Sequence, residues 1–125
     1  MLQIAFIGRT NKTNAIISDS ILSNFDAEIQ FIRPEFVFSE FPEEELKNRN
    51  MVIVDLNTSS GTGNAPKNIS LLYQITQDIP ILVLDYNEDR KFVQPLIDAG
   101  ASGIISTTPT EIEVISAINE LLPKK

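Results

Sequence analysis

Two aspartates in this chain, Asp55 and Asp85, each follow a short apolar run. The stretch "MVIVDLN" has four apolar residues and then Asp55, and a run this short is typical of a strand buried on both faces. Ligand sites in open α/β sheets lie outside the carboxyl ends of the strands, so Asp55 is a candidate site residue. The alternative is that Asp55 only caps the following turn, because aspartate readily accepts hydrogen bonds from nearby backbone N–H groups.

Acid–base chemistry is one reaction type that Asp55 and Asp85 could support, because two carboxylates held close together can share a proton. The chain has no histidine and no cysteine. This composition excludes Ser-His-Asp catalysis, a thiolate nucleophile and ordinary zinc sites. No nucleophile, set of metal ligands or oxyanion arrangement accompanies the two aspartates, so we expect that the protein is not an enzyme.

The composition is that of one soluble globular domain. The chain has 125 residues, of which 42% are hydrophobic and 22% are charged, and we expect a single domain over residues 1–125. The formal net charge of −7 argues against a nucleic-acid or anionic-membrane partner. No apolar run approaches the length of a membrane span and the chain opens directly as a strand, so we expect a cytoplasmic location.

Short apolar runs alternate with longer amphipathic ones, which is typical of a parallel sheet covered by helices. The pattern predicts strands over 2–8, 27–32, 51–56, 79–85 and 102–106. It predicts helices over 13–25, 39–49, 67–76, 87–100 and 108–122. Right-handed crossovers then give an α/β fold, a doubly wound (βα)5 three-layer sandwich. Its expected five-stranded parallel sheet has the order 2-1-3-4-5, which is flavodoxin-like.

Four of the predicted helices carry detailed expectations. In the first and third, spacing predicts apolar stripes formed by Ile16, Ile17, Ile21 and Leu22, and by Ile69, Leu72, Tyr73 and Thr76. In the fourth, Pro95 lies well inside the helix and Gly100 ends it. In the last, Thr108 is the expected N-cap, with Pro109 in the first turn and Glu111 placed for a capping box.

Three stretches resemble the receiver domain of bacterial response regulators. "DIPILVLDYNEDR" (78–90) is similar to the fourth strand and following loop of that family, and "IDAGASGIIS" (97–106) to the segment that enters its fifth strand. "MVIVDLN" resembles the third strand, which carries the phosphoacceptor aspartate at the position of Asp55, and Gly63 matches a glycine usually found eight residues later. The resemblance covers the whole chain in order.

The resemblance implies a set of helper residues, and this chain departs from most of them. In the family, two acidic residues after the first strand hold Mg²⁺, a Ser or Thr ends the fourth strand, an aromatic residue switches on the fifth strand, and a Lys follows it. In this chain Gly8 and Arg9 stand at the positions of the two acidic residues, and Asp85 stands at the position of the Ser or Thr. Ile104 stands at the position of the aromatic residue, and Thr107 at that of the Lys. Only Asp55 is retained, so we expect a degenerate receiver, or pseudo-receiver, with no cofactor, weak Mg²⁺ binding and weak or absent phosphorylation.

Arg9 is a candidate to form an ion pair in place of the phosphorylation site. It flanks the third strand, so we expect it to pair with Asp55 or to bridge Asp55 and Asp85 in a fixed ion pair. The alternative is that Arg9 is only a solvated turn residue, since exposed ion pairs are weak.

The resemblance also implies a role in a two-component phosphorelay through protein–protein contacts. The expected partner is a histidine kinase or a downstream effector, with no nucleic acid and no membrane. The family's usual contact surface is the fourth helix, fifth strand and fifth helix, here Glu88 to Leu122, and the same face could form a homodimer.

Two other interpretations remain open. The first is a conventional receiver that is phosphorylated on Asp55 with a weakly bound metal. The second is a small-ligand or flavin binder of flavodoxin type, in which "GRTNKTN" (8–14) would hold a phosphate and "SSGTGN" (59–64) would border the flavin ring. Neither loop contains an aromatic residue to stack on that ring, and 8–14 can equally be a helix N-cap and a solvated turn.

Overall fold

A computed structural model describes residues 1–8, 10–32, 46–55, 65–85 and 90–122. Its five strands form one sheet with the order β2-β1-β3-β4-β5, and every pairing is parallel. The strands are β1 (Leu2–Ile7), β2 (Ala27–Ile32), β3 (Met51–Asp55), β4 (Ile81–Leu84) and β5 (Gly103–Ile105). The predicted fold class and strand order are therefore confirmed.

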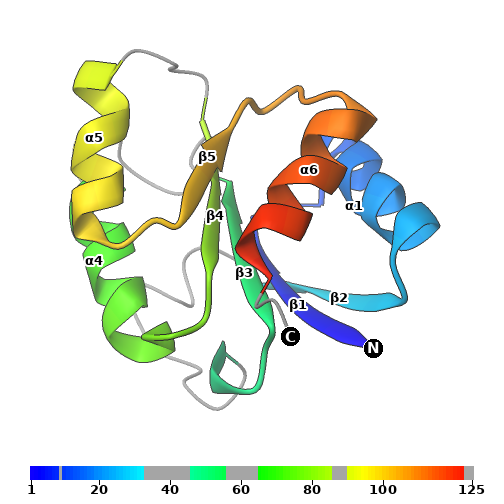
Figure 1. Ribbon diagram of the computed structural model, residues 1–125, viewed down its shortest axis with the longest axis horizontal. Coiled ribbons are helices and arrows are strands. Elements are labelled where there is room, and N and C mark those ends of the chain that lie inside the picture. The colour runs from blue at the N-terminus through cyan, green and yellow to red at the C-terminus, as the bar shows by residue number, and fades with distance from the viewer. Residues whose placement is uncertain (9, 33–45, 56–64, 86–89, 123–125) are drawn as a thin grey trace.

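In the described part of the chain, four helices cover the two faces of the sheet. They are α1 (Lys12–Asn24), α4 (Ala65–Thr76), α5 (Arg90–Ala99) and α6 (Glu111–Leu121). Figure 1 shows α4 and α5 on one side of the strands and α1 and α6 on the other. This three-layer arrangement follows from right-handed β-α-β crossovers on either side of β1.

The core consists of two hydrophobic clusters separated by the sheet. Alternate residues of the central strands point to opposite faces, so Val52 and Val54 pack beneath α4 and α5 while Met51 and Ile53 pack beneath α1 and α6. Every residue of β3 is buried. A strand buried on both faces explains why "MVIV" is continuously apolar instead of alternating.

The predicted helix stripes were partly wrong. In α1, Ile17 and Ile21 are buried as expected, whereas Ile16 and Leu22 are 57% and 48% exposed. In α4 the stripe residues are buried except Tyr73, which is 46% exposed. Residues that are adjacent in a helix point in different directions, so only those spaced three or four apart share the face that contacts the sheet. The predicted stripes included adjacent apolar residues and were therefore too wide.

The last helix begins later than predicted, so the Thr108 N-cap, the first-turn position of Pro109 and the Glu111 capping box were all wrong. The N-cap of α6 is Thr110, whose Oγ1 accepts from the backbone N of Glu113 at 3.2 Å, while the backbone N of Thr110 donates to Glu113 Oε1 at 3.3 Å. The backbone N of Thr108 donates instead to Ser106 Oγ at 3.1 Å, which places Thr108 in the turn that follows β5.

Pro95 lies inside α5 and Gly100 follows its end, as expected. Gly100 has a φ of +128°, and a Cβ added there would lie 2.6–2.7 Å from side-chain atoms of Tyr73. Both the backbone conformation and the close approach of α4 require glycine at this position.

Several expectations lie wholly or partly outside the described residues. They include most of the helix over 39–49, Asn87 at the start of the fourth helix, Gly63 and the loop 59–64. Residues 65 and 66, which precede the predicted helix over 67–76, belong to α4. Within the described parts of the chain, the helices are all too short or too polar to span a bilayer.

Candidate functional site

Asp55 lies at the carboxyl end of β3, between β1 and β4 in the centre of the sheet. It is only 4% exposed. A buried carboxylate must accept hydrogen bonds to offset its lost hydration. The side-chain amide of Asn14 donates one, from Nδ2 to Asp55 Oδ2 at 2.9 Å, in a buried environment.

Asn14 was predicted only as part of the alternative phosphate-binding segment over 8–14, and not as a partner of Asp55. It lies in the first turn of α1 and is 1% exposed. Its spacing of three and seven residues from Ile17 and Ile21 places an amide on the buried face of the helix, which is a signal that the sequence does contain. The 41 residues that separate Asn14 from Asp55 hide their contact until the strand order is known.

Gly8 completes this arrangement by leaving room for it. It is buried directly after β1, and its backbone N donates to the carbonyl of Ile32 at 3.0 Å. A Cβ added to Gly8 would lie 3.1 Å from Asp55 Cβ and 3.2 Å from Asn14 Nδ2. The lack of a side chain at residue 8 therefore allows the Asn14–Asp55 hydrogen bond to form without crowding.

Asp85 follows β4 on the neighbouring strand. Asp55 is in register with Leu84, so Asp85 is one residue farther out at the same edge of the sheet. Its backbone N donates to the carbonyl of Ile105 at 3.1 Å, which extends the β4–β5 pairing, and its side chain is half-buried. The prediction that Asp55 and Asp85 occupy neighbouring strand ends is in agreement with this register.

The remaining predicted pocket residues lie at and after β5. Ile104 pairs with Val83 and packs, partly buried, against the cluster under α4 and α5. Thr107 follows β5 and is 5% exposed, and its hydroxyl oxygen has no hydrogen-bond partner among the described residues. A threonine here presents a short neutral hydroxyl where a lysine would extend a positive charge.

Arg9 lies outside the described residues. The predicted Arg9–Asp55–Asp85 ion pair therefore stays a prediction, as does the alternative that Arg9 is a solvated turn residue.

The first βα turn behaves as a helix cap. The side chain of Asn11 is the N-cap of α1 and accepts from the backbone N of Asn14 at 2.8 Å. Asn14 is thus held twice, through its backbone by Asn11 and through its amide by Asp55. The N-cap interpretation of this segment, left open by its sequence, agrees with this geometry.

The residues at this edge do not fit a magnesium site of the kind that the resemblance implies. Mg²⁺ prefers carboxylate oxygens, and Gly8 offers no side chain where the first acidic ligand would stand. Asp55 Oδ2 instead faces an amide N–H, a donor that repels cations. Among the described residues, no three His, Cys, Asp or Glu side chains form a group that could hold a metal ion.

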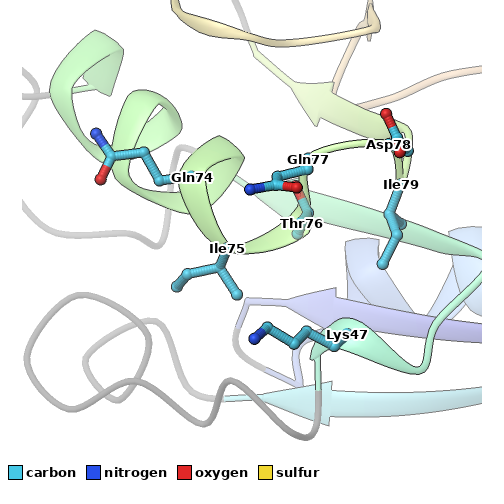
Figure 2. A pocket seen from close by; sticks show the side chains of 7 residues that line it. All are labelled: Lys47, Gln74, Ile75, Thr76, Gln77, Asp78 and Ile79. Atoms are coloured by element: carbon cyan, nitrogen blue, oxygen red, sulfur yellow. The ribbon is translucent and has the colours of Figure 1, made fainter.

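A separate cavity of about 290 Å³ lies at the opposite edge of the sheet. Its lining residues are Lys47 and residues 74–79, which end α4 and precede β4. Figure 2 shows Ile75 pointing down toward the Lys47 side chain, with Thr76 and Ile79 alongside. Because this cavity lies at the amino ends of β3 and β4, it shares no residue with the Asp55 site.

No family model and no curated protein sequence matches the chain, but many solved structures do. A protein from Burkholderia pseudomallei described as pilus assembly-related has 10% identity and a TM-score of 0.81, with 97% of this chain and 89% of that chain covered. A protein described as a response regulator from Chloroflexus aurantiacus has 14% identity and a TM-score of 0.78, with 98% of each chain covered. The chemotaxis response regulator CheY4 of Vibrio cholerae has 14% identity and a TM-score of 0.78, with coverages of 98% and 99%.

The chain has a CheY-like, flavodoxin-like fold. The likeness to CheY4 covers 98% of this chain, whose sheet places Asp55 at the carboxyl end of its central strand. At 10–14% identity it establishes this receiver-type fold and not the activity of any one neighbour.

Proposed function

We propose that this protein is a receiver-like signalling domain of a two-component phosphorelay that acts through protein–protein contacts and is a pseudo-receiver. The observation that carries the proposal is the burial and hydrogen bonding of the Asp55 side chain. Its position at the end of β3 is that of a phosphoacceptor, yet its carboxylate is buried and hydrogen-bonded to Asn14. A nucleophile in this state is shielded from a phosphoryl donor.

The neighbouring positions support the same conclusion. Phosphoryl transfer needs cations to neutralise the developing charge on the phosphoryl oxygens. Gly8 and Thr107 supply neither a metal ligand nor a positive charge, and Asp85 adds a negative one. Ile104 cannot perform the rotation that an aromatic side chain undergoes at the family's switch position.

The output of such a domain is a surface presented to a partner. By analogy with receivers we assign that surface to α5, β5 and α6, and its partner is a histidine kinase or a downstream effector. Homodimerisation through the same face is part of this proposal. The domain is not an enzyme, and it requires no cofactor.

The test is an amide NMR titration of the protein with Mg²⁺ and then with beryllofluoride, an acyl-phosphate mimic. We expect no saturable shifts around Asp55 and none that spread to Ile104 or α6. The matched control is Asp55→Asn, which keeps the side-chain shape and removes the nucleophilic carboxylate. Saturable shifts in the wild type that are absent from Asp55→Asn would show a conventional, phosphorylatable receiver instead.

A second candidate function is a docking domain in the assembly of a larger complex. It is favoured by the pilus assembly-related neighbour, whose TM-score of 0.81 accompanies coverage of 97% of this chain and 89% of that chain. Phosphotransfer assays with purified histidine kinases, together with partner capture under crosslinking, separate the two candidates. Capture of a kinase supports signalling, and capture of assembly components without any kinase supports docking.

A further inference from the structure

The amide of Asn14 faces the carboxylate of Asp55 at the end of β3. It donates to Asp55 Oδ2 at 2.9 Å from a side chain that is 1% exposed. We propose that Asn14 is a built-in, neutral substitute for the metal ion, and that it makes the structure at the end of β3 independent of divalent cations. This inference deepens the proposed function and rests on it.

The first argument is chemical. A buried carboxylate is stable only when positive charge or hydrogen-bond donors face it. Asn14 provides a donor without charge, and the donor is fixed by the fold instead of being taken from solution. A cation that approached the same oxygen would meet the N–H of Asn14 and would have to displace it.

The second argument is steric. The space that a Cβ of residue 8 would take is bordered by Asp55 Cβ at 3.1 Å and by Asn14 Nδ2 at 3.2 Å. An acidic residue at position 8 would therefore crowd the Asn14–Asp55 pair. The contact of Asn14 with Asp55 therefore depends on glycine at position 8, because a side chain there would take the space beside the Asn14 amide.

The third argument concerns the support of Asn14. Asn11 caps α1 by accepting from the backbone N of Asn14 at 2.8 Å, which holds the first turn in place. The amide is thus presented to Asp55 by a capped helix terminus. A donor held by regular structure loses little conformational entropy when it forms its hydrogen bond.

The direct test exchanges the donor for a metal ligand. Asn14→Asp places a second carboxylate against Asp55, and two adjacent carboxylates attract a divalent cation. We expect Mg²⁺ affinity, measured from amide shifts around Asp55, to rise at least about tenfold over the wild type because one negative charge is added beside another. Asn119→Asp, on the exposed side of α6, is the charge-matched control and should leave the affinity unchanged.

The outcomes separate this inference from the proposed function. Saturable Mg²⁺ shifts at Asp55 in the wild type would overturn the inference whether or not any variant folds. A folded Asn14→Asp that responds to Mg²⁺ no more than Asn119→Asp would also overturn it. If Asn14→Asp fails in this way, the proposed pseudo-receiver is still supported as long as beryllofluoride causes no amide shifts in the wild-type protein.

A double-mutant cycle tests the inference without any metal. Asn14→Ala removes the donor, so the thermal midpoint should fall in the wild-type background and fall much less in an Asp55→Ala background, where no carboxylate needs it. Equal losses in both backgrounds would mean that Asn14 only packs, and would overturn the inference. The loss that depends on Asp55 is the signature of a charge-compensating donor.

Discussion

At the residue scale, the site is determined by three small groups: the Asp55 carboxylate, the Asn14 amide and the absent side chain of Gly8. Asp55 was recognisable in the sequence because an apolar run ended on a charge. The contact of Asn14 with Asp55 was missed because the two residues lie 41 positions apart in the chain. A helix residue that can hydrogen-bond a buried carboxylate has a recognisable signal in the sequence. It is a polar residue that lies three or seven positions from the apolar core residues of an amphipathic helix, and therefore on the buried face.

Gly8 provides the sharpest prediction at this scale. Gly8→Ala should lower the free energy of unfolding by about 1–3 kcal/mol, because its Cβ would press on Asp55 and Asn14 in a closely packed site. Urea denaturation followed by circular dichroism measures the change. Gly103→Ala is the matched control, since its Cβ would meet only side-chain methyl groups, those of Leu121 at 3.3 and 3.6 Å and one of Leu82 at 3.6 Å. A larger loss for Gly103→Ala than for Gly8→Ala would contradict the crowding argument.

At the element scale, the sheet was more predictable than the ends of the helices. The strands were predicted to within two residues at each end, because burial on both faces leaves continuous apolar runs that few other structures produce. Helix starts depend on weaker signals. Before α6 the T-x-x-E pattern of a capping box occurs twice, two residues apart, once from Thr108 to Glu111 and once from Thr110 to Glu113. Only in the folded chain are the two distinguished, because the backbone N of Thr108 donates to Ser106 Oγ.

The two threonines make the start of α6 testable. Thr110→Ala removes the capping box and should reduce the free energy of unfolding by about 1 kcal/mol. Thr108→Ala leaves the helix cap intact and should change it by less than about 0.5 kcal/mol, as is usual for exposed positions. Chemical denaturation of the two variants beside the wild type gives both values. A greater cost for Thr108→Ala would mean that the helix begins earlier in solution.

At the scale of the whole molecule, the strand order explains why the Asp55 site is where it is. β3 is central and all its neighbours are parallel, so the carboxyl ends of β1, β3 and β4 converge on one edge of the sheet (Figure 1). Sequence periodicity predicted the strands and helices, and right-handed crossovers with the common order of five-stranded doubly wound sheets then predicted this convergence. It could not predict which side chains meet there, because those contacts join segments that are distant in the chain and depend on packing at the scale of single atoms.

The sheet also divides the core into two clusters, and we expect both to unfold as one unit. Leu72 of α4 and Ile118 of α6 are each fully buried on opposite faces. Leu72→Ala and Ile118→Ala should each reduce the free energy of unfolding by about 2–5 kcal/mol, which is a large part of the stability of a domain this size. Ile112→Ala, at a side chain that is 76% exposed, is the control and should have little effect.

Amide hydrogen exchange shows whether the two clusters are coupled. Because β3 contributes residues to both, loss of either cluster should remove the support of the other. Leu72→Ala should then speed exchange in α6 by the same factor as in α4, and Ile118→Ala should do the reverse. Acceleration confined to the helix that carries the substitution would show two independently unfolding layers.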